Sequence, residues 1–487
     1  MAKFKLKGPA FWSVLLQFSR FGGNALVFFA IARFLTIEQI GAFGMAYAPI
    51  RWLQVLHKAG VSNCVVVAMR GNSVGSARDQ EEVFSALFWL SMGITVIASM
   101  VLVGIAAVLQ IFSENSQGVT WMIYAMIPVL IAFGLSSVPE GIMQKKLQIK
   151  ALAIRTLFVQ AVAAMITFML AMKGYGGWAL VGFTVLNAVA SSVISIIAAR
   201  WLPKGRPRWP HIREQLPQMS SISGRALLAS STRPMMQFAI GLVIGFEASG
   251  AFQIAQRVYQ ILDALCLAPI RFLILPLFSR EVDRKGALSA TTVIRALQMA
   301  GIISAPFYLG TMIISRPTLT WIIGPENAAH SVLPLQLLCL LGLNITSVTI
   351  LTQAATVIGH SKVTFWRALW TLCGTAILGL PSLFISTEAV VLSFVAASYA
   401  NLIYYYTCLG PAFNRAPKDL VLPVAYPYLA GLLALVPLTG IHLFWSPQSS
   451  AFRWVYMGGI LTALSLYAVL LKLLVPAAWR EFVEHMR

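Results

Sequence analysis

The chain has 487 residues, of which 58% are hydrophobic and only 11% carry a charge. Soluble proteins carry about 25% charged residues, so this composition excludes an ordinary water-soluble protein and indicates an integral membrane protein. The formal net charge of +20 lies in short breaks between apolar runs. No basic domain or arm could follow a phosphate backbone, which argues against a nucleic-acid partner.

The apolar stretches predict an all-α integral membrane protein with about 14 transmembrane helices. A spanning helix needs about 20 apolar residues, and the breaks between the stretches are too short to hold an extramembrane domain. The N-terminal Lys3, Lys5 and Lys7 resemble the start of a signal peptide, but no small-residue cleavage site follows, so we expect an uncleaved first helix. The predicted helices cover residues 11–34, 40–69, 83–111, 119–139, 151–172, 176–199, 217–245, 250–278, 290–315, 328–358, 363–384, 388–410, 422–444 and 453–475.

A basic, proline-rich segment at residues 200–217 is the strongest predicted linker. Its prolines, which exclude a continuous helix, are Pro203, Pro207, Pro210 and Pro217. The segment divides the first twelve predicted helices into two sets of six. We therefore predict an N-terminal six-helix lobe over residues 1–205, a C-terminal six-helix lobe over 206–412, and two additional transmembrane helices with a cytoplasmic tail over 413–487.

A short repeat supports this division. The tripeptide Gly-Ala-Phe opens the second predicted helix of each lobe, at residues 41–43 and again at 250–252. Six helices are an even number, so the two lobes would share one orientation and form a parallel pseudo-repeat, an arrangement that secondary transporters use to build a central site. We interpret the repeat as the remnant of a duplication.

The charges in the loops predict the orientation. With the N-terminus in the cytoplasm, the cytoplasmic breaks hold 23 Lys and Arg residues and the opposite side holds four, which are Arg33, Lys173, Arg316 and Arg453. Because cytoplasmic loops of membrane proteins are enriched in Lys and Arg, we expect both termini to lie in the cytoplasm.

Nine cations lie inside or at the ends of the predicted helices, whereas Asp263 is the only acidic residue well inside one. The nine are Arg20, Arg51, Lys58, Arg155, Arg225, Arg233, Arg257, Arg271 and Arg295. Charged side chains inside a membrane cost about 2.5–3.5 kcal/mol each on insertion scales and usually face a cavity. Arg155, Arg225 and Arg295 lie near helix ends, where snorkelling to the interface is the simpler explanation.

Helical spacing places polar residues of the predicted first, second and eighth helices on single faces, which would turn towards water or other helices. We therefore predict a hydrated cationic cavity. Its candidate substrate-binding residues are Arg20, Asn24, Arg51, Gln54, Lys58, Arg233, Arg257 and Gln260. Asp263 and His57 are candidate groups for ion coupling. For Arg257 and Asp263, a structural ion pair is the alternative interpretation.

No pattern in the sequence favours catalysis, a cofactor or a bound metal. There is no glycine-rich phosphate loop, no HExxH and no Ser/His/Asp arrangement. The cysteines lie within apolar stretches without CxxC spacing, which indicates small buried side chains rather than ligands or disulfides. They are Cys64, Cys266, Cys339, Cys373 and Cys408.

Three stretches resemble the polysaccharide transport family of lipid-linked oligosaccharide flippases, often called Wzx. They are "ARFLTIEQIGAFGMAYAPI" at 32–50, "QKKLQIKALAIR" at 144–155 and "GYGGWALVGFTVLNAVAS" at 174–191. The family belongs to the superfamily of MATE drug exporters and lipid II flippases. The resemblance is strongest over residues 10–205, is supported by "GFEASGAFQIAQRVYQI" at 245–261, and is diffuse beyond about residue 290.

The resemblance implies two six-helix lobes around a cationic cavity. It also implies transport of an undecaprenyl-pyrophosphate-linked sugar repeat unit across the bacterial inner membrane, for exopolysaccharide, capsule or O-antigen synthesis, with a polysaccharide polymerase and a chain-length regulator as partners. Lipid II flippases use Arg residues on their first, second and eighth helices, and Arg20, Arg51 and Arg257 lie on the corresponding helices here.

Three other functions are alternatives. A lipid II flippase would share the charge pattern and differ in cargo. A MATE-type drug or cation antiporter should carry an acidic residue in the first-lobe cavity, where this chain has Arg20, Arg51 and Lys58. A membrane-embedded polysaccharide polymerase or ligase would normally carry a large outward loop, which this chain lacks.

Overall fold

The structure is a computed structural model that describes most of the chain. The described residues are 12, 16, 19, 23–62, 64–65, 77–112, 117–146, 148–203, 209–413, 415–444, 452–476 and 479. The chain divides into two compact units. The first contains residues 1–254 and 383–387, and the second contains residues 255–382 and 388–487.

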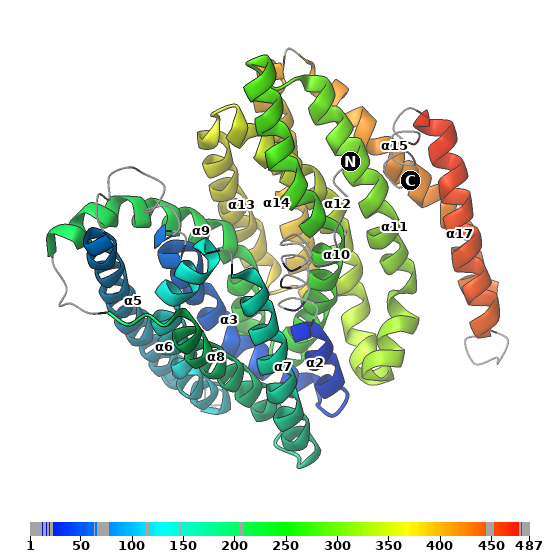
Figure 1. Ribbon diagram of the computed structural model, residues 1–487. Helices are drawn as coiled ribbons and strands as arrows, with labels where there is room; N and C mark the ends of the chain where they lie inside the picture. Colours follow the sequence, from blue (N-terminus) through cyan, green and yellow to red (C-terminus); the bar gives the residue numbers. More distant parts are fainter. Residues whose placement is uncertain are drawn as a thin grey trace. The chain divides into compact units, whose positions relative to one another are not determined.

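The first unit is a bundle of helices formed almost entirely by residues 1–254 (Figure 1). Its helices are α2 (Asn24–Ala32), α3 (Ile37–Val55), the π-helical turn η2 (Leu56–Val61), α5 (Ala77–Phe112), α6 (Gln117–Lys145), α7 (Ile149–Met172), α8 (Gly177–Ala199), α9 (Trp209–Val243) and the first turns of α10 (Phe246–Lys285). In this bundle α6 packs against both α5 and α8, and α3 packs against α9 and α6.

The second unit holds the rest of α10 and the helices that follow it. These are α11 (Ala290–Ile323), α12 (Pro325–Val357), α13 (Ser361–Ser382), α14 (Thr387–Leu409), the 3₁₀ turn η4 (Pro411–Phe413), α15 (Pro417–Ala434), α16 (Val436–Phe444) and α17 (Phe452–Leu474). Here α11 packs against α12 and α15, and α17 packs against α15 and α16 (Figure 1).

The prediction of an all-α membrane protein is confirmed. Each of the fourteen predicted stretches contains a helix, and nine helices of the described residues are long and apolar enough to cross a membrane. The chain is therefore a multi-pass membrane protein. The thirteenth stretch is divided at Leu435 into α15 and α16.

The predicted linker at 200–217 is wrong in its second half, because α9 begins at Trp209 and includes Pro210 and Pro217. Pro210 lies in the first turn, where the missing N–H has no intrahelical partner to lose. The lobe boundaries near residues 205 and 412 stay a prediction.

Buried apolar side chains fill each unit, while many large apolar side chains point outwards. In the first unit Trp201 makes edge-to-face contacts with Phe84 and Phe88. Exposed residues such as Met100 and Trp121 lie on spanning helices of the same unit. An outer surface that remains apolar suits contact with lipid tails.

Candidate functional site

Helix α3 and the π-helical turn η2 that continues it position three of the predicted site residues. It begins with a capping box, in which the Thr36 side chain accepts from the Gln39 backbone N–H and the Gln39 side chain accepts from the Thr36 backbone. Further along, Arg51 is half-buried, Gln54 is buried and Lys58 is exposed. Helix α3 and η2 thus carry two of the predicted cations, Arg51 and Lys58, on a segment otherwise rich in apolar residues.

The end of this helix is the π-helical turn η2, which packs His57 inwards. His57 is 1% exposed, and its Nε2 lies 2.9 Å from the Thr95 hydroxyl of α5. Lys58 points elsewhere, with its ammonium 4.3 Å from the centroid of the Phe133 ring on α6. Neighbouring residues of one turn therefore have opposite environments.

Helix α9 lies along α3 and brings a third cation to the pair. The Trp52 indole N–H donates a 2.8 Å hydrogen bond to the Ser231 hydroxyl. Because Trp52 follows Arg51 directly and Ser231 precedes Arg233 by two residues, this bond places the two cations at a similar level of the helix pair. Arg233 is half-buried.

The two Gly-Ala-Phe sequences lie against each other in the first unit. A Cβ at Gly41 would overlap the Phe246 carbonyl oxygen and lie 2.7 Å from the Gly250 nitrogen, and one at Gly250 would overlap the Ile37 carbonyl oxygen. Only glycine permits this approach of α3 and α10.

Polar side chains reinforce the same contact. Gln237 of α9 donates to the Ser249 carbonyl at 2.8 Å and to the Ser249 hydroxyl at 2.5 Å. The Ser249 hydroxyl in turn donates to the Gly41 carbonyl at 3.1 Å. We call this set of contacts the glycine contact. The sequence repeat is therefore also a packing surface, which its interpretation as a remnant of duplication did not include.

Asn24 belongs to a different part of the first unit. Its Oδ1 accepts hydrogen bonds from Gln160 of α7 at 3.1 Å and from Asn187 of α8 at 3.3 Å. Asn24, a predicted substrate-binding residue, is thus held by two carboxamides that the sequence analysis did not single out.

A buried ion pair is the clearest polar feature that the sequence analysis missed. Arg155 of α7 donates from Nη1 to Glu140 Oε1 of α6 at 2.8 Å, with side-chain exposures of 6% and 17%. The same nitrogen donates to the Ser195 hydroxyl of α8. The interpretation of Arg155 as a snorkelling side chain is therefore wrong. The sequence signal that could have indicated this ion pair is Glu140, an acidic residue that lies fifteen residues before Arg155 in a neighbouring apolar helix.

The remaining predicted residues lie on the part of α10 that belongs to the second unit. Arg257, Gln260 and Asp263 are all half-buried there. Asp263 accepts a 3.1 Å hydrogen bond from Arg271, two helical turns further on. Asp263 therefore forms an ion pair with Arg271, and the alternative pair with Arg257 stays a prediction.

The structure thus groups the predicted site only in part. Arg51, Gln54, Lys58, His57 and Arg233 lie on one group of packed helices, α3, η2 and α9. Asn24 joins α7 and α8, and the α10 residues belong to the second unit. Arg20 and Arg225 are outside the side chains that the structure describes. That all eight substrate-binding residues share one cavity stays a prediction.

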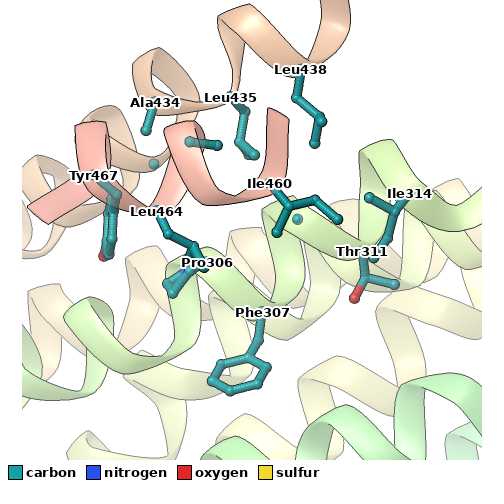
Figure 2. Close-up of a pocket in the computed structure, with 13 residues that line it drawn as sticks. Pro306, Phe307, Thr311, Ile314, Ala434, Leu435, Leu438, Ile460, Leu464 and Tyr467 are labelled. Atoms are coloured by element: carbon teal, nitrogen blue, oxygen red, sulfur yellow. The ribbon is translucent and has the colours of Figure 1, made fainter. Parts of the chain in front are cut away.

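The second unit has an apolar cavity of about 170 Å³ between α11, α15, α16 and α17. Figure 2 shows Phe307, Leu464 and Tyr467 among its lining residues. None of the lining residues is charged, so this cavity lacks the chemistry to hold an anionic group.

No group of three metal-binding side chains occurs among the described residues. The five cysteines are free, and three of them are buried.

Comparison with known proteins finds a matching family model and a related transport protein. A family model described as "Polysaccharide biosynthesis protein" matches residues 30–329. The succinoglycan biosynthesis transport protein ExoT of Rhizobium meliloti (strain 1021) is 21% identical over 369 residues, covering 74% of this chain and 70% of ExoT.

Two solved structures have a similar fold. The lipid II flippase MurJ, in an inward closed conformation, aligns with a TM-score of 0.74 at 15% identity, covering 97% of this chain and 100% of MurJ. An inward-facing multidrug resistance MATE family transporter of the MOP superfamily aligns with a TM-score of 0.60 at 16% identity, covering 80% of this chain and 95% of the transporter.

The fold therefore places this chain in a class of helical multi-pass membrane proteins whose solved members include a flippase and multidrug transporters. Within that class, the chain belongs to the polysaccharide biosynthesis protein family, because the family model matches more than half of it. The family resemblance found in the sequence is confirmed.

Proposed function

We propose that this protein is a flippase for lipid-linked oligosaccharides. It moves undecaprenyl-pyrophosphate-linked repeat units from the inner to the outer face of the bacterial inner membrane and catalyses no chemical reaction. The proposal extends to this chain what ExoT is by name, a transport protein of polysaccharide biosynthesis. A polysaccharide polymerase and a chain-length regulator would act on the cargo after transport.

One observation carries the proposal. Arg51, Lys58 and Arg233 lie on a packed group of helices, α3, η2 and α9, and these three residues fall within the second and seventh transmembrane stretches predicted from the sequence. Each such cation costs about 2.5–3.5 kcal/mol to insert. A pyrophosphate offers several anionic oxygens, and charge-assisted hydrogen bonds to them are stronger than neutral ones. A pyrophosphate-linked cargo would therefore offset the free-energy cost of inserting these cations.

The Arg and Lys side chains would bind the phosphate groups in different ways. The Arg51 and Arg233 guanidinium groups can each present two parallel N–H donors to a phosphate, whereas Lys58 presents a compact charge. Arg20, Asn24, Gln54, Arg257 and Gln260 complete the proposed site, and Asp263 and His57 remain candidates for ion coupling.

The proposed mechanism is alternating access by rocking of two lobes. The sequence holds no Walker motif for ATP, so the proposal uses binding energy and a membrane gradient. The close approach of Gly41 and Gly250 provides a compact contact between α3 and the start of α10. Both termini would lie in the cytoplasm.

The test is a deletion strain complemented with charge-reversed variants. We expect the deletion to abolish surface polysaccharide and to raise the lipid-linked repeat unit on the cytoplasmic face. Arg51→Glu or Lys58→Glu should fail to complement although the protein inserts, because the reversed charge repels the pyrophosphate. Lys173→Glu, a change at another exposed lysine, is the matched control and should complement.

Normal polysaccharide export by both reversed variants would contradict the proposal. Accumulation of lipid II with cell lysis would instead identify the protein as a lipid II flippase. Loss of drug resistance with intact polysaccharide would favour an antiporter.

A further inference from the structure

The π-helical turn η2 is an irregularity in the helix that carries two of the proposed binding cations. The backbone N–H of Ser62 donates to the His57 carbonyl, five residues earlier, in place of the four-residue spacing of an α-helix. π-turns are rare and occur frequently at functional sites. Because the extra residue changes the direction of the side chains around it, the turn decides where Lys58 points.

A buried hydrogen bond connects this turn to α5. His57 Nε2 lies 2.9 Å from the Thr95 hydroxyl, and that hydroxyl donates its one proton to the Ser91 carbonyl at 2.9 Å. A threonine hydroxyl has a single donor. The bonding therefore assigns the proton to His57 Nε2, which donates to Thr95.

The network continues to the helix that Lys58 contacts. The Ser91 hydroxyl donates to the Gly134 carbonyl of α6 at 3.1 Å, and Phe133 directly precedes Gly134. The Lys58 ammonium lies over the Phe133 ring, 4.3 Å from its centroid. His57 is thus connected to Gly134 of α6 by hydrogen bonds that run through Thr95 and Ser91. Its neighbour Lys58 is connected to Phe133 by the cation–π contact.

A third contact fixes the turn on its remaining side. A Cβ at Gly60 would overlap the Ser223 hydroxyl of α9, so glycine lets α9 approach η2. The turn is therefore held by α5, α6 and α9 together. A cation–π contact attracts an ammonium without neutralising its charge, so the Phe133 contact is compatible with binding of an anionic group by Lys58.

We propose that His57 is a positioning residue for Lys58. The hydrogen bond from His57 to Thr95 holds the π-turn, and the turn sets the Lys58 ammonium where it helps to anchor the phosphate groups of the cargo. This inference rests on the proposed function for the role of Lys58. It gives His57 a task other than proton transfer.

The first test measures position without any cargo. Lys58→Cys is made in a background without the native cysteines, and its rate of labelling by a charged methanethiosulfonate reagent is measured. We expect Thr95→Val, which removes the hydroxyl and keeps the shape, to change that rate about five- to tenfold, because a buried hydrogen bond is worth about 1 kcal/mol. Thr95→Ser keeps the hydroxyl and should leave the rate unchanged.

The matched control is Thr167→Val on α7. Thr167 is a buried threonine whose hydroxyl also bonds a carbonyl in the preceding turn of its helix, that of Ala163 at 2.7 Å. We expect this control to leave labelling at position 58 unchanged. An unchanged rate in Thr95→Val, or an equal change in Thr167→Val, would overturn the positioning role.

The second test keeps Lys58 and uses inorganic pyrophosphate as the probe, with calorimetry on the purified protein. His57→Leu and Thr95→Val should weaken binding about as much as Lys58→Gln does, and His57→Gln, which retains a donor, should restore it. In Lys58→Gln the Thr95→Val change should have no further effect, because residues that act through one another are not additive.

Full additivity of these two changes would overturn the positioning role. Should Lys58→Gln bind pyrophosphate like the unaltered protein, the proposed cationic anchor would fail while the labelling result still decides the role of His57. The two failures are therefore distinguishable. Where His57→Leu does not insert, the isosteric Thr95→Val carries both tests.

Discussion

Two cations of the first unit, Arg155 and Lys58, have opposite degrees of burial. The Arg155 side chain is 6% exposed and donates hydrogen bonds to Glu140 and Ser195. These contacts connect the three helices α6, α7 and α8. Lys58 is exposed and rests on an aromatic face. The sequence alone assigned Arg155 to the interface and Lys58 to the cavity. It could not show that Glu140, on the preceding helix, lies within hydrogen-bonding distance of Arg155.

The ion pair leads to a prediction about stability. Glu140→Ala should lower the free energy of unfolding by about 3–5 kcal/mol, because it leaves Arg155 as a buried charge without its carboxylate. The double change Glu140→Leu and Arg155→Met should recover most of that loss, since apolar side chains of similar volume replace both charges. Thermal unfolding of the purified protein in detergent measures both. Equal destabilisation by the single and the double change would show that the charge is not the cause.

At the scale of elements, the glycine contact holds α3 and α10 close together. Gly41 and Gly250 bring α3 and α10 so close that a Cβ on either would overlap a backbone carbonyl. The repeat of Gly-Ala-Phe was visible in the sequence, and its position at the second helix of each lobe stays a prediction. The contact between the two copies was not predictable from spacing, because it depends on how two helices cross about two hundred residues apart.

Alanine substitution tests this contact with opposite signs at two sites. Gly41→Ala should destabilise the protein and reduce transport, because the Phe246 carbonyl and α3 must separate. Gly93→Ala is the control, since a Cβ there meets nothing within 4 Å. The control should be neutral or stabilising by up to about 1 kcal/mol, the helix propensity gained over glycine. Melting temperatures of the two variants, measured side by side, decide the sign, and a stable Gly41→Ala would contradict the contact.

At the scale of the whole molecule, periodicity and apolar length predicted nearly all helices, because the bilayer requires long apolar segments with internally bonded backbones. The errors in the predicted helix boundaries lie at the segment around Pro210 and Pro217 and in the thirteenth stretch. Pro210 and Pro217 suggested a linker, yet α9 includes both. The predicted thirteenth helix is divided at Leu435. Arg51, Lys58 and Arg233 lie on helices that pack together, and their role as a binding site stays a prediction. Gln160, Asn187 and Glu140 were not singled out, because their hydrogen-bond partners lie on other helices.

The orientation of the chain is the property that the charge distribution predicts without any contact. The predicted inner side carries 23 Lys and Arg residues against four outside, and this bias sets the topology of membrane proteins. Alkaline phosphatase fused after Gly174, between α7 and α8, should therefore be active, and a fusion after Gly286, between α10 and α11, should be inactive. Green fluorescent protein at the same two positions should give the reverse. Phosphatase activity at Gly286 would show that the chain has the opposite orientation to the predicted one, with both termini outside the cytoplasm.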